Sequence, residues 1–190
     1  MNHIETIHLK AIGGSPVLAG GAAGAAVQKA VLNELSLKHV ELCALDFSGV
    51  ECATASFIRE AVFGTRDSLR RAGLITQIVV TNGNQAVREE LLLVARAVGS
   101  SIVHATGASD HLTEPIVFGE LDAAQRETLA LVLQLGEATA SDLAAENPAV
   151  KPTAWNNRLA NLASRGLLSE TRRERHKVYR AVVKGLSYGR

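Results

Sequence analysis

The sequence has few aromatic residues and only two cysteines. Aromatic residues make up 4% of the 190 positions, so the core has to be built mainly from alanine, valine and leucine. Cys43 and Cys52 do not have the spacing of metal ligands, and both stand next to apolar residues. We therefore expect two buried, reduced thiols, and neither a disulfide nor a zinc site.

Long hydrophobic runs are also absent. No apolar stretch approaches the roughly 20 residues that a membrane-spanning helix needs, and the N-terminal "MNHIETIHLK" contains no apolar signal segment. These absences predict a cytoplasmic protein that does not bind membranes. Apolar residues nevertheless make up 47% of the chain, which is enough for a packed core and argues against disorder.

The net charge is small, but the charge is unevenly distributed. The whole chain has a formal net charge of +1. Residues 151–190 contain ten Lys and Arg against two Glu, which gives +8; the other 150 residues contain ten against seventeen Asp and Glu, which gives −7. This asymmetry predicts a basic C-terminal region that meets a polyanion, joined to a mildly acidic region that does not.

The first 106 residues alternate between the periodicities of strands and helices. Strand-like apolar runs occupy 6–12, 40–47, 75–83 and 101–106. Helical spacing is found in 25–35, 54–73 and 85–99. Strands that alternate with helices predict an α/β layer structure for residues 1–106.

The pattern changes after residue 106. Residues 107–120 contain a proline, two glycines and several small polar residues, which predicts a linker with a short strand at "PIVFG". Residues 121–190 are predicted to form a mostly helical second domain. Its predicted elements are helices at 121–136, 139–147 and 152–166 and a hairpin with strands 167–171 and 177–183 around a tip at 172–176.

The third of these helices has an unusual polar face. On a helical wheel, Trp155, Leu159 and Leu162 fall on the side of the core. The opposite side carries Thr153, Asn156, Asn157 and Asn161. Asparagine is a poor helix former, but its amide can make two hydrogen bonds to adenine. Together with Lys151 beside the positive helix N-terminus, this face is typical of base recognition; the alternative is an ordinary polar face.

The tip of the predicted hairpin is basic, although turns normally use Gly, Asn or Asp. The expected contacts to the DNA backbone are Arg172, Arg173, Arg175, His176 and Lys177. With "SDLA" in the second helix and "RLANLASRGLL" before the basic tip, the segment resembles the winged helix-turn-helix domains of bacterial transcription regulators. The resemblance implies that the third helix reads DNA and that the hairpin forms the wing, although some winged helices bind protein instead.

The segment "LDFSGVECATASFIREAV" (45–62) resembles the strand-to-helix core of STAS domains, the fold of bacterial anti-anti-sigma factors. The resemblance covers about residues 5–106 and implies a domain that associates with itself or with a protein partner. Phosphorylated members have Asp followed by Ser at the start of the helix, where this chain has Thr54 and Ala55. Thr54 and Ser56 are therefore candidate phosphorylation sites; alternatively, Thr54 caps the helix and Ser56 packs near it.

Two further patterns suggest other chemistry. "AGGAAG" (19–24), with Asp46 further on, is similar to a dinucleotide-binding loop but lacks the first glycine of that motif. His104, Asp110 and His111 are candidate metal ligands, or a solvated cluster in a loop. No nucleophile–base pair stands out, so we expect neither a cofactor nor an enzymatic activity.

The sequence thus predicts a bacterial DNA-binding transcription regulator with an α/β domain at 1–106, a linker at 107–120 and a winged helix at 121–190. Its expected partners are double-stranded DNA and a second copy of the chain, with the homodimer held through apolar positions of helices 22–35 and 85–98. The rival hypothesis is a partner-switching signalling protein whose winged helix docks onto protein.

Overall fold

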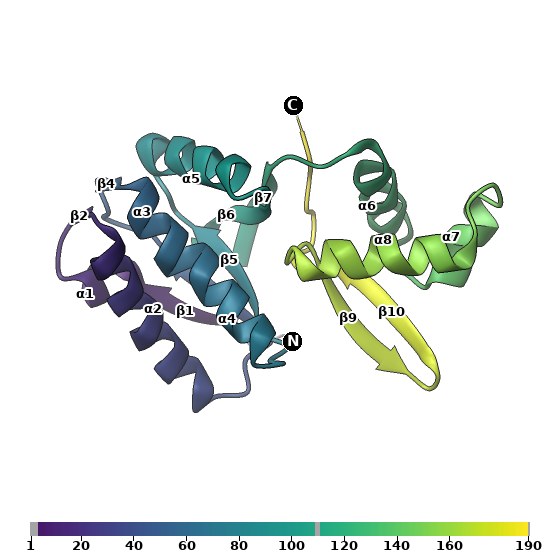
Figure 1. Cartoon of the computed structure of the whole chain (residues 1–190), viewed down its shortest axis with the longest axis horizontal. Helices are drawn as coiled ribbons and strands as arrows, with labels where there is room; N and C mark the ends of the chain where they lie inside the picture. The colour runs from purple at the N-terminus through teal and green to yellow at the C-terminus, as the bar shows by residue number, and fades with distance from the viewer. Residues whose placement is uncertain (1–3, 109–110, 190) are drawn as a thin grey trace.

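The computed structural model describes residues 4–108 and 111–189 and has a mixed α/β fold (Figure 1). Its centre is a five-stranded sheet with the order β1-β3-β5-β6-β7. The strands are β1 (Ile4–His8), β3 (Leu42–Asp46), β5 (Gln77–Thr81), β6 (Ser101–Ala108) and β7 (His111–Gly119). The first four are parallel, and β7 pairs with β6 in the antiparallel direction. The strand predicted at 6–12 is therefore shorter than expected, because the chain turns into a helix after His8.

Helices from the first 100 residues cover one face of this sheet. They are α1 (Leu9–Gly13), α2 (Gly21–Ser36), α3 (Ala55–Ile58), η1 (Arg59–Gly64), α4 (Thr65–Arg71) and α5 (Gln85–Ala97). Here α3, η1 and α4 follow one another without a break, and η1 is a π-helical turn. A small parallel pair, β2 (Val17–Leu18) with β4 (Cys52–Ala53), lies before α2 and α3 in the chain.

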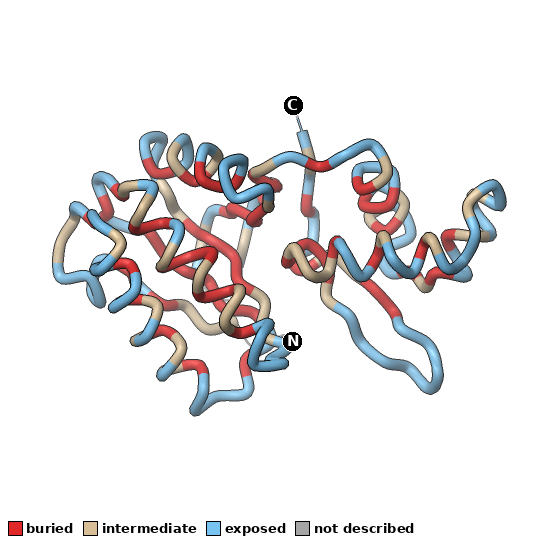
Figure 2. The backbone as a smooth tube through the Cα atoms, in the orientation of Figure 1, coloured by how far each residue is buried: buried red, intermediate tan, exposed pale blue. Residues whose placement is uncertain are grey.

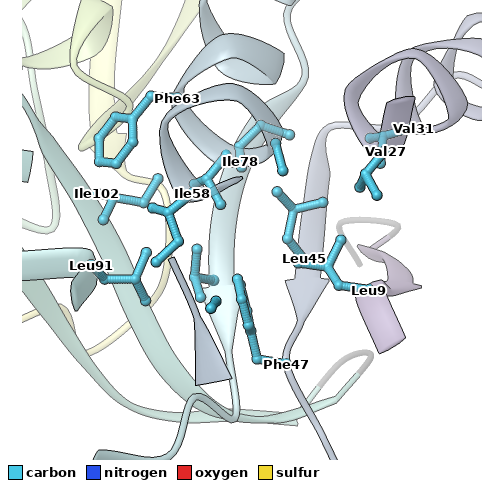
Figure 3. Packing of buried hydrophobic residues seen from close by; sticks show 14 of the residues in the cluster. Leu9, Val27, Val31, Leu45, Phe47, Ile58, Phe63, Ile78, Leu91 and Ile102 are labelled. Atoms are coloured by element: carbon cyan, nitrogen blue, oxygen red, sulfur yellow. The ribbon is translucent and has the colours of Figure 1, made fainter. Parts of the chain in front are cut away.

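The core under these helices is made of interlocking, mainly aliphatic side chains together with Phe47 and Phe63 (Figure 3). Ile78 and Ile102 from the sheet meet Ile58 and Leu91 from the helices, and all four are at most 1% exposed. The helices also approach each other closely, since a Cβ atom at Gly24 of α2 would lie 2.7 Å from the carbonyl oxygen of Phe57. Glycine at position 24 is therefore a requirement of helix packing.

The other face of the sheet is partly covered by the C-terminal elements. These are α6 (Ala123–Leu135), β8 (Glu137–Ala138), α7 (Ala140–Glu146), α8 (Pro152–Ser164), β9 (Leu168–Arg173) and β10 (His176–Ala181). They pack against the sheet through α8 and the base of the β9–β10 hairpin, while α6 and α7 lie to the side of it (Figure 1). The last two strands and β8 form a small sheet with the order β8-β10-β9. Ala44 and Val79 of the large sheet belong to the same buried cluster as Leu162, Leu168 and Val182. The two regions thus share a core, and an arrangement of two separate domains is not confirmed.

The predicted linker at 107–120 is mostly strand. Residues 111–119 pair with β6 as β7, and Val117 and Phe118 are buried. On its other side β7 meets the C-terminal tail, where the Ser187 amide donates to the Pro115 carbonyl at 2.9 Å. The strand predicted at "PIVFG" is therefore present as part of a longer strand, and Pro115 is tolerated because it lies in an edge strand, where it interrupts few ladder bonds. The composition of residues 107–120 does not reveal that β6 supplies the hydrogen-bond partners for their backbone groups.

Two further expectations concern the burial of both cysteines and the absence of a membrane-spanning helix. Cys43 is buried as predicted, and burial raises the pKa of its thiol far above the usual range. Cys52 is exposed, contrary to the prediction, because it lies in the short β4 strand at the protein surface. Within the ranges 4–108 and 111–189, no helix is long and apolar enough to cross a membrane.

Candidate nucleic-acid interface

The helix α8 divides into a buried side and an exposed side, as its sequence predicts. Trp155, Leu159 and Leu162 are completely buried and anchor the helix in the shared core. The exposed residues of the opposite side are Thr153, Asn156, Asn157, Ala160 and Asn161. The side chains of Asn156 and Asn157 form no hydrogen bond with the described residues, so both side-chain amides are free for an external partner.

The first turn of α8 has no side-chain cap. Lys151 occupies the position before the helix and Pro152 the first helical position, and no side chain accepts a bond from the first-turn amides. The amide groups at a helix N-terminus carry partial positive charge. Together with the exposed Lys151, they form a site that suits an anion such as a phosphate group.

Two polar residues of α8 are held by the protein itself. The Gln125 side-chain amide donates to Asn161 Oδ1 at 2.8 Å, which ties Asn161 to α6. Arg158 lies over the Trp155 ring at 4.8 Å and donates to Glu127 Oε2 at 3.0 Å. Asn161 is thus less available than predicted, and Arg158 is directed back to α6 rather than outward.

The hairpin is longer and its tip smaller than the sequence predicts. Residues 168–173 pair with 176–181, so that only Glu174 and Arg175 form the turn. Glu174 has a positive φ of 56°, a backbone conformation that residues other than Gly and Asn rarely adopt. The predicted tip at 172–176 is wrong in its bounds because ladder pairing continues through Arg172 and Arg173. The hairpin extends away from the rest of the molecule and is exposed towards its end (Figure 2).

Two of the predicted DNA contacts form ion pairs within the protein. Arg173 donates two hydrogen bonds to the carboxylate of Glu137 in β8. Lys177 pairs with Glu170 across the hairpin at 2.8 Å. Burial favours the neutral form of Glu170, but hydrogen bonds from Lys177 and Tyr179 outweigh it and lower the pKa of this carboxyl group. Arg173 and Lys177 therefore hold the shape of the hairpin in addition to carrying charge.

Three other basic residues near the end of the hairpin form no such pair. Arg172, Arg175 and His176 are exposed and form no hydrogen bond or ion pair with the described residues. We refer to these three residues as the basic tip. Arg172 and Arg175 carry fixed positive charges, and an external anion close to them would lower their electrostatic energy. The basic tip and the polar face of α8 are the strongest candidates for binding a polyanion.

The candidate phosphorylation sites lie at the start of α3. Thr54 Oγ1 accepts hydrogen bonds from the Phe57 amide at 3.4 Å and the Gly20 amide at 3.1 Å. Thr54 therefore caps the helix, and its hydroxyl lies 3.2 Å from that of Ser56. Both residues are partly exposed.

The two markers of a dinucleotide site are used structurally. Gly24 is needed for packing against Phe57. Asp46 is 2% exposed and accepts hydrogen bonds from His8 at 2.6 Å and Asn82 at 2.7 Å. Burial favours the neutral form of Asp46, but the bonds from Asn82, Ser48 and His8 lower the pKa of its carboxyl group. The sequence does not reveal that His8 belongs to this cluster: it is the last residue of β1 and lies inside the strand predicted at 6–12, 38 positions from Asp46.

The proposed metal ligands are not brought together within the described part of the chain. His104 is 3% exposed in β6, whereas His111 is exposed at the start of β7. Asp110 lies outside the described residues. Among residues 4–108 and 111–189, no group of three His, Cys, Asp or Glu side chains is placed to hold a metal ion.

No family model and no curated protein matches this chain. Its function therefore has to be argued from the geometry of the exposed polar groups. The C-terminal region combines hydrogen-bonding amides, a helix N-terminus and the basic tip, which are groups of the kinds that proteins use to contact phosphates and base edges.

Proposed function

We propose that this protein is a bacterial, cytoplasmic transcription regulator that binds double-stranded DNA through a winged helix formed by α6, α7, α8 and the β9–β10 hairpin. The observation that carries the proposal is the combination of free amides on α8 with the unpaired basic tip beside it in the sequence. The β1–β7 sheet and its helices, a STAS-like region, would sense a signal or partner.

The two parts of the proposed interface have different tasks. The basic tip and Lys151 contact phosphates, which provides affinity that depends on salt but hardly on sequence. Asn156, Asn157 and Thr153 contact base edges in the major groove, where asparagine selects adenine and the threonine methyl group contacts thymine. Arg173 and Lys177 contribute less to phosphate binding than the sequence suggests, because each already has a carboxylate partner.

The proposed regulator binds DNA as a homodimer, because one winged helix covers only a short site. Two copies related by two-fold symmetry would read inverted half-sites about one helical turn apart. The interface would include exposed apolar side chains near α2 and α5: Leu93 and Val98 of the α5 region are 57% and 39% exposed, and Leu37 after α2 is 88% exposed. Light scattering of the full chain tests the dimer; a strictly monomeric mass at tens of micromolar would refute it.

Fluorescence anisotropy with a labelled duplex of arbitrary sequence tests phosphate binding by the basic tip. The affinity of the wild type should fall steeply with salt, with a logarithmic slope of about −0.9 for each phosphate contacted. Replacing Arg172 and Arg175 together by Ala should weaken binding and reduce that slope by about 2.

The control for this experiment is a second double variant, Arg70→Ala with Arg71→Ala. These two exposed arginines on α4 remove the same charge from another surface and should leave the slope unchanged. Equal slopes for the wild type and the tip variant, or equal losses in both double variants, would reject the proposed interface.

The rival function is partner switching through the STAS-like region, with the winged helix docking onto protein. It is favoured by the neighbouring hydroxyls of Thr54 and Ser56 at the start of α3. Phosphorylation of Thr54 would break the helix cap that its hydroxyl now provides. The rival would be favoured if mass spectrometry of the protein from its native host detected a phosphate group on Thr54 or Ser56 and if the full chain bound no duplex.

A further inference from the structure

A polar pocket lies between α5, β6, β7 and the C-terminal tail, away from the proposed DNA interface. It is lined by Arg88 of α5, by residues of β6 and β7, and by Gly185 and Ser187 of the tail. Its cavity volume of about 410 Å³ is within the range of small-molecule sites, about 300–1,000 Å³. Because the tail follows the hairpin, the pocket touches both regions of the chain. We call it the α5–β7 pocket.

One wall of the α5–β7 pocket contains a buried polar atom that has no partner. The His104 side chain is 3% exposed and stacks on Phe118 with 5.3 Å between the ring centroids. Its Nε2 atom makes no hydrogen bond with the described residues. A buried polar atom without a partner destabilises a protein, and a ligand in the pocket that reaches Nε2 would supply the missing hydrogen bond. Burial and nearby Arg88 lower the pKa of the imidazole to about 4, so the ring is neutral.

The walls also carry one positive and one negative group. The Arg88 guanidinium lies 5.8 Å from the centroid of the Phe118 ring, and it forms no ion pair with the described part of the chain. Glu114 of β7 likewise has no ion-pair partner there, and its φ of 50° is in the left-handed region. The hydroxyls of Thr106 and Ser187 also line the pocket. A ligand that matches these walls must itself carry both charges.

We propose that the α5–β7 pocket binds a small zwitterion of the α-amino acid class. Its carboxylate pairs with Arg88, its ammonium group pairs with Glu114, and His104 Nε2 hydrogen-bonds to it. A ligand with only one sign of charge would leave the opposite wall without a partner, which is unfavourable once the site is desolvated. The proposal concerns binding alone and does not depend on whether the chain binds DNA.

Thermal unfolding of the full chain tests this site. Each of the twenty common amino acids is added at millimolar concentration, with succinate and 1,4-diaminobutane as probes of one charge sign. At least one amino acid should raise the unfolding midpoint by about 5 °C at saturation. Neither succinate nor the diamine should do so. A wild type that no amino acid stabilises, or that succinate stabilises equally, would overturn the proposal.

Two variants separate a ligand site from a histidine that merely packs in the core. His104→Phe keeps a ring to stack on Phe118 but removes Nε2, and Arg88→Gln removes the cation from an exposed position. Both should abolish the shift seen with the wild type. Arg96→Gln, on the same helix but outside the pocket, should retain it. If His104→Phe and Arg88→Gln respond to the amino acid as the wild type does, the pocket is not its site.

Discussion

The two faces of the central sheet are covered by layers of different kinds. On one face, α2, η1 and α5 pack closely, and Gly24 allows two helix backbones to approach each other. On the other face, α8 and the base of the hairpin share a cluster with the sheet, while the end of the hairpin extends into solvent. The first layer consists of closely packed helices, whereas the second holds α8 and the hairpin by their inner sides and leaves their outer sides exposed to solvent.

The helices α5 and α8 make this difference visible in two elements of equal length. Each has 13 residues and a buried apolar stripe. α5 is capped by Asn84, and Gln85 donates to Glu89 on its outer side at 2.9 Å. α8 has no side-chain cap and carries asparagines, which are poor helix formers. The surface of α5 therefore stabilises its own helix, while that of α8 does so poorly, as expected for a surface that contacts something else.

The largest expected effect concerns the coupling between the layers. Leu91→Ala in α5 and Leu159→Ala in α8 each remove a fully buried side chain and should lower the free energy of unfolding by about 2–5 kcal/mol. Because the sheet is shared, either variant should shift a single transition. Trp155, the only tryptophan, reports on the C-terminal region, while circular dichroism reports on all helices. Two separate transitions in urea would instead mean that the layers unfold independently.

The next effect is the pH dependence contributed by His104, which lies on the helix-covered side. Burial lowers the pKa of this imidazole from 6.5 to about 4, so folding favours its neutral form. The resulting stability is present above pH 6.5 and is lost as the pH falls towards 4, by up to about 3 kcal/mol. His104→Phe should therefore lose less stability over this range than the wild type in urea titrations. Parallel losses would show that the imidazole is already protonated in the fold.

A smaller effect should distinguish two glycines of α2. Gly24→Ala places a methyl group against the Phe57 carbonyl and should cost about 1–3 kcal/mol. Gly21→Ala has only ordinary contacts and should stabilise the protein by about 0.4–1 kcal/mol. Thermal unfolding of both variants measures the difference. If Gly24→Ala were as stable as Gly21→Ala, the helices of this layer would not be as closely packed as the structure has them.

The smallest effect on stability belongs to the outer face of α8. Asn156→Ala and Asn157→Ala should each stabilise the protein by about 0.5 kcal/mol, because alanine is the better helix former. Each should also reduce discrimination between base pairs by about 1–3 kcal/mol, with little change in non-specific binding. Selection from random duplexes measures the second effect, and Glu89→Ala on α5 is the matched control. An unchanged consensus in both asparagine variants would remove these residues from base recognition.

Local sequence patterns predicted the helices and the buried stripe of α8. Trp155, Leu159 and Leu162 recur at helical spacing, so their common burial follows from periodicity alone. The same kind of pattern found only the "PIVFG" part of β7, because the rest of this strand is defined by its partners on β6 and in the tail. Likewise, nothing in the local sequence connects Arg173 with Glu137, which is 36 positions away.

The sequence by itself determined where most of the longer helices and strands form, that the C-terminal 40 residues are basic, and which side of α8 is polar, since these follow from residues close in the chain. Only the tertiary structure decided that both regions share a buried core, that Arg173 and Lys177 form ion pairs while Arg172 and Arg175 do not, and that His104 borders a pocket. These features depend on contacts between distant segments, and the free energy of such contacts is set by burial and geometry that no local pattern specifies.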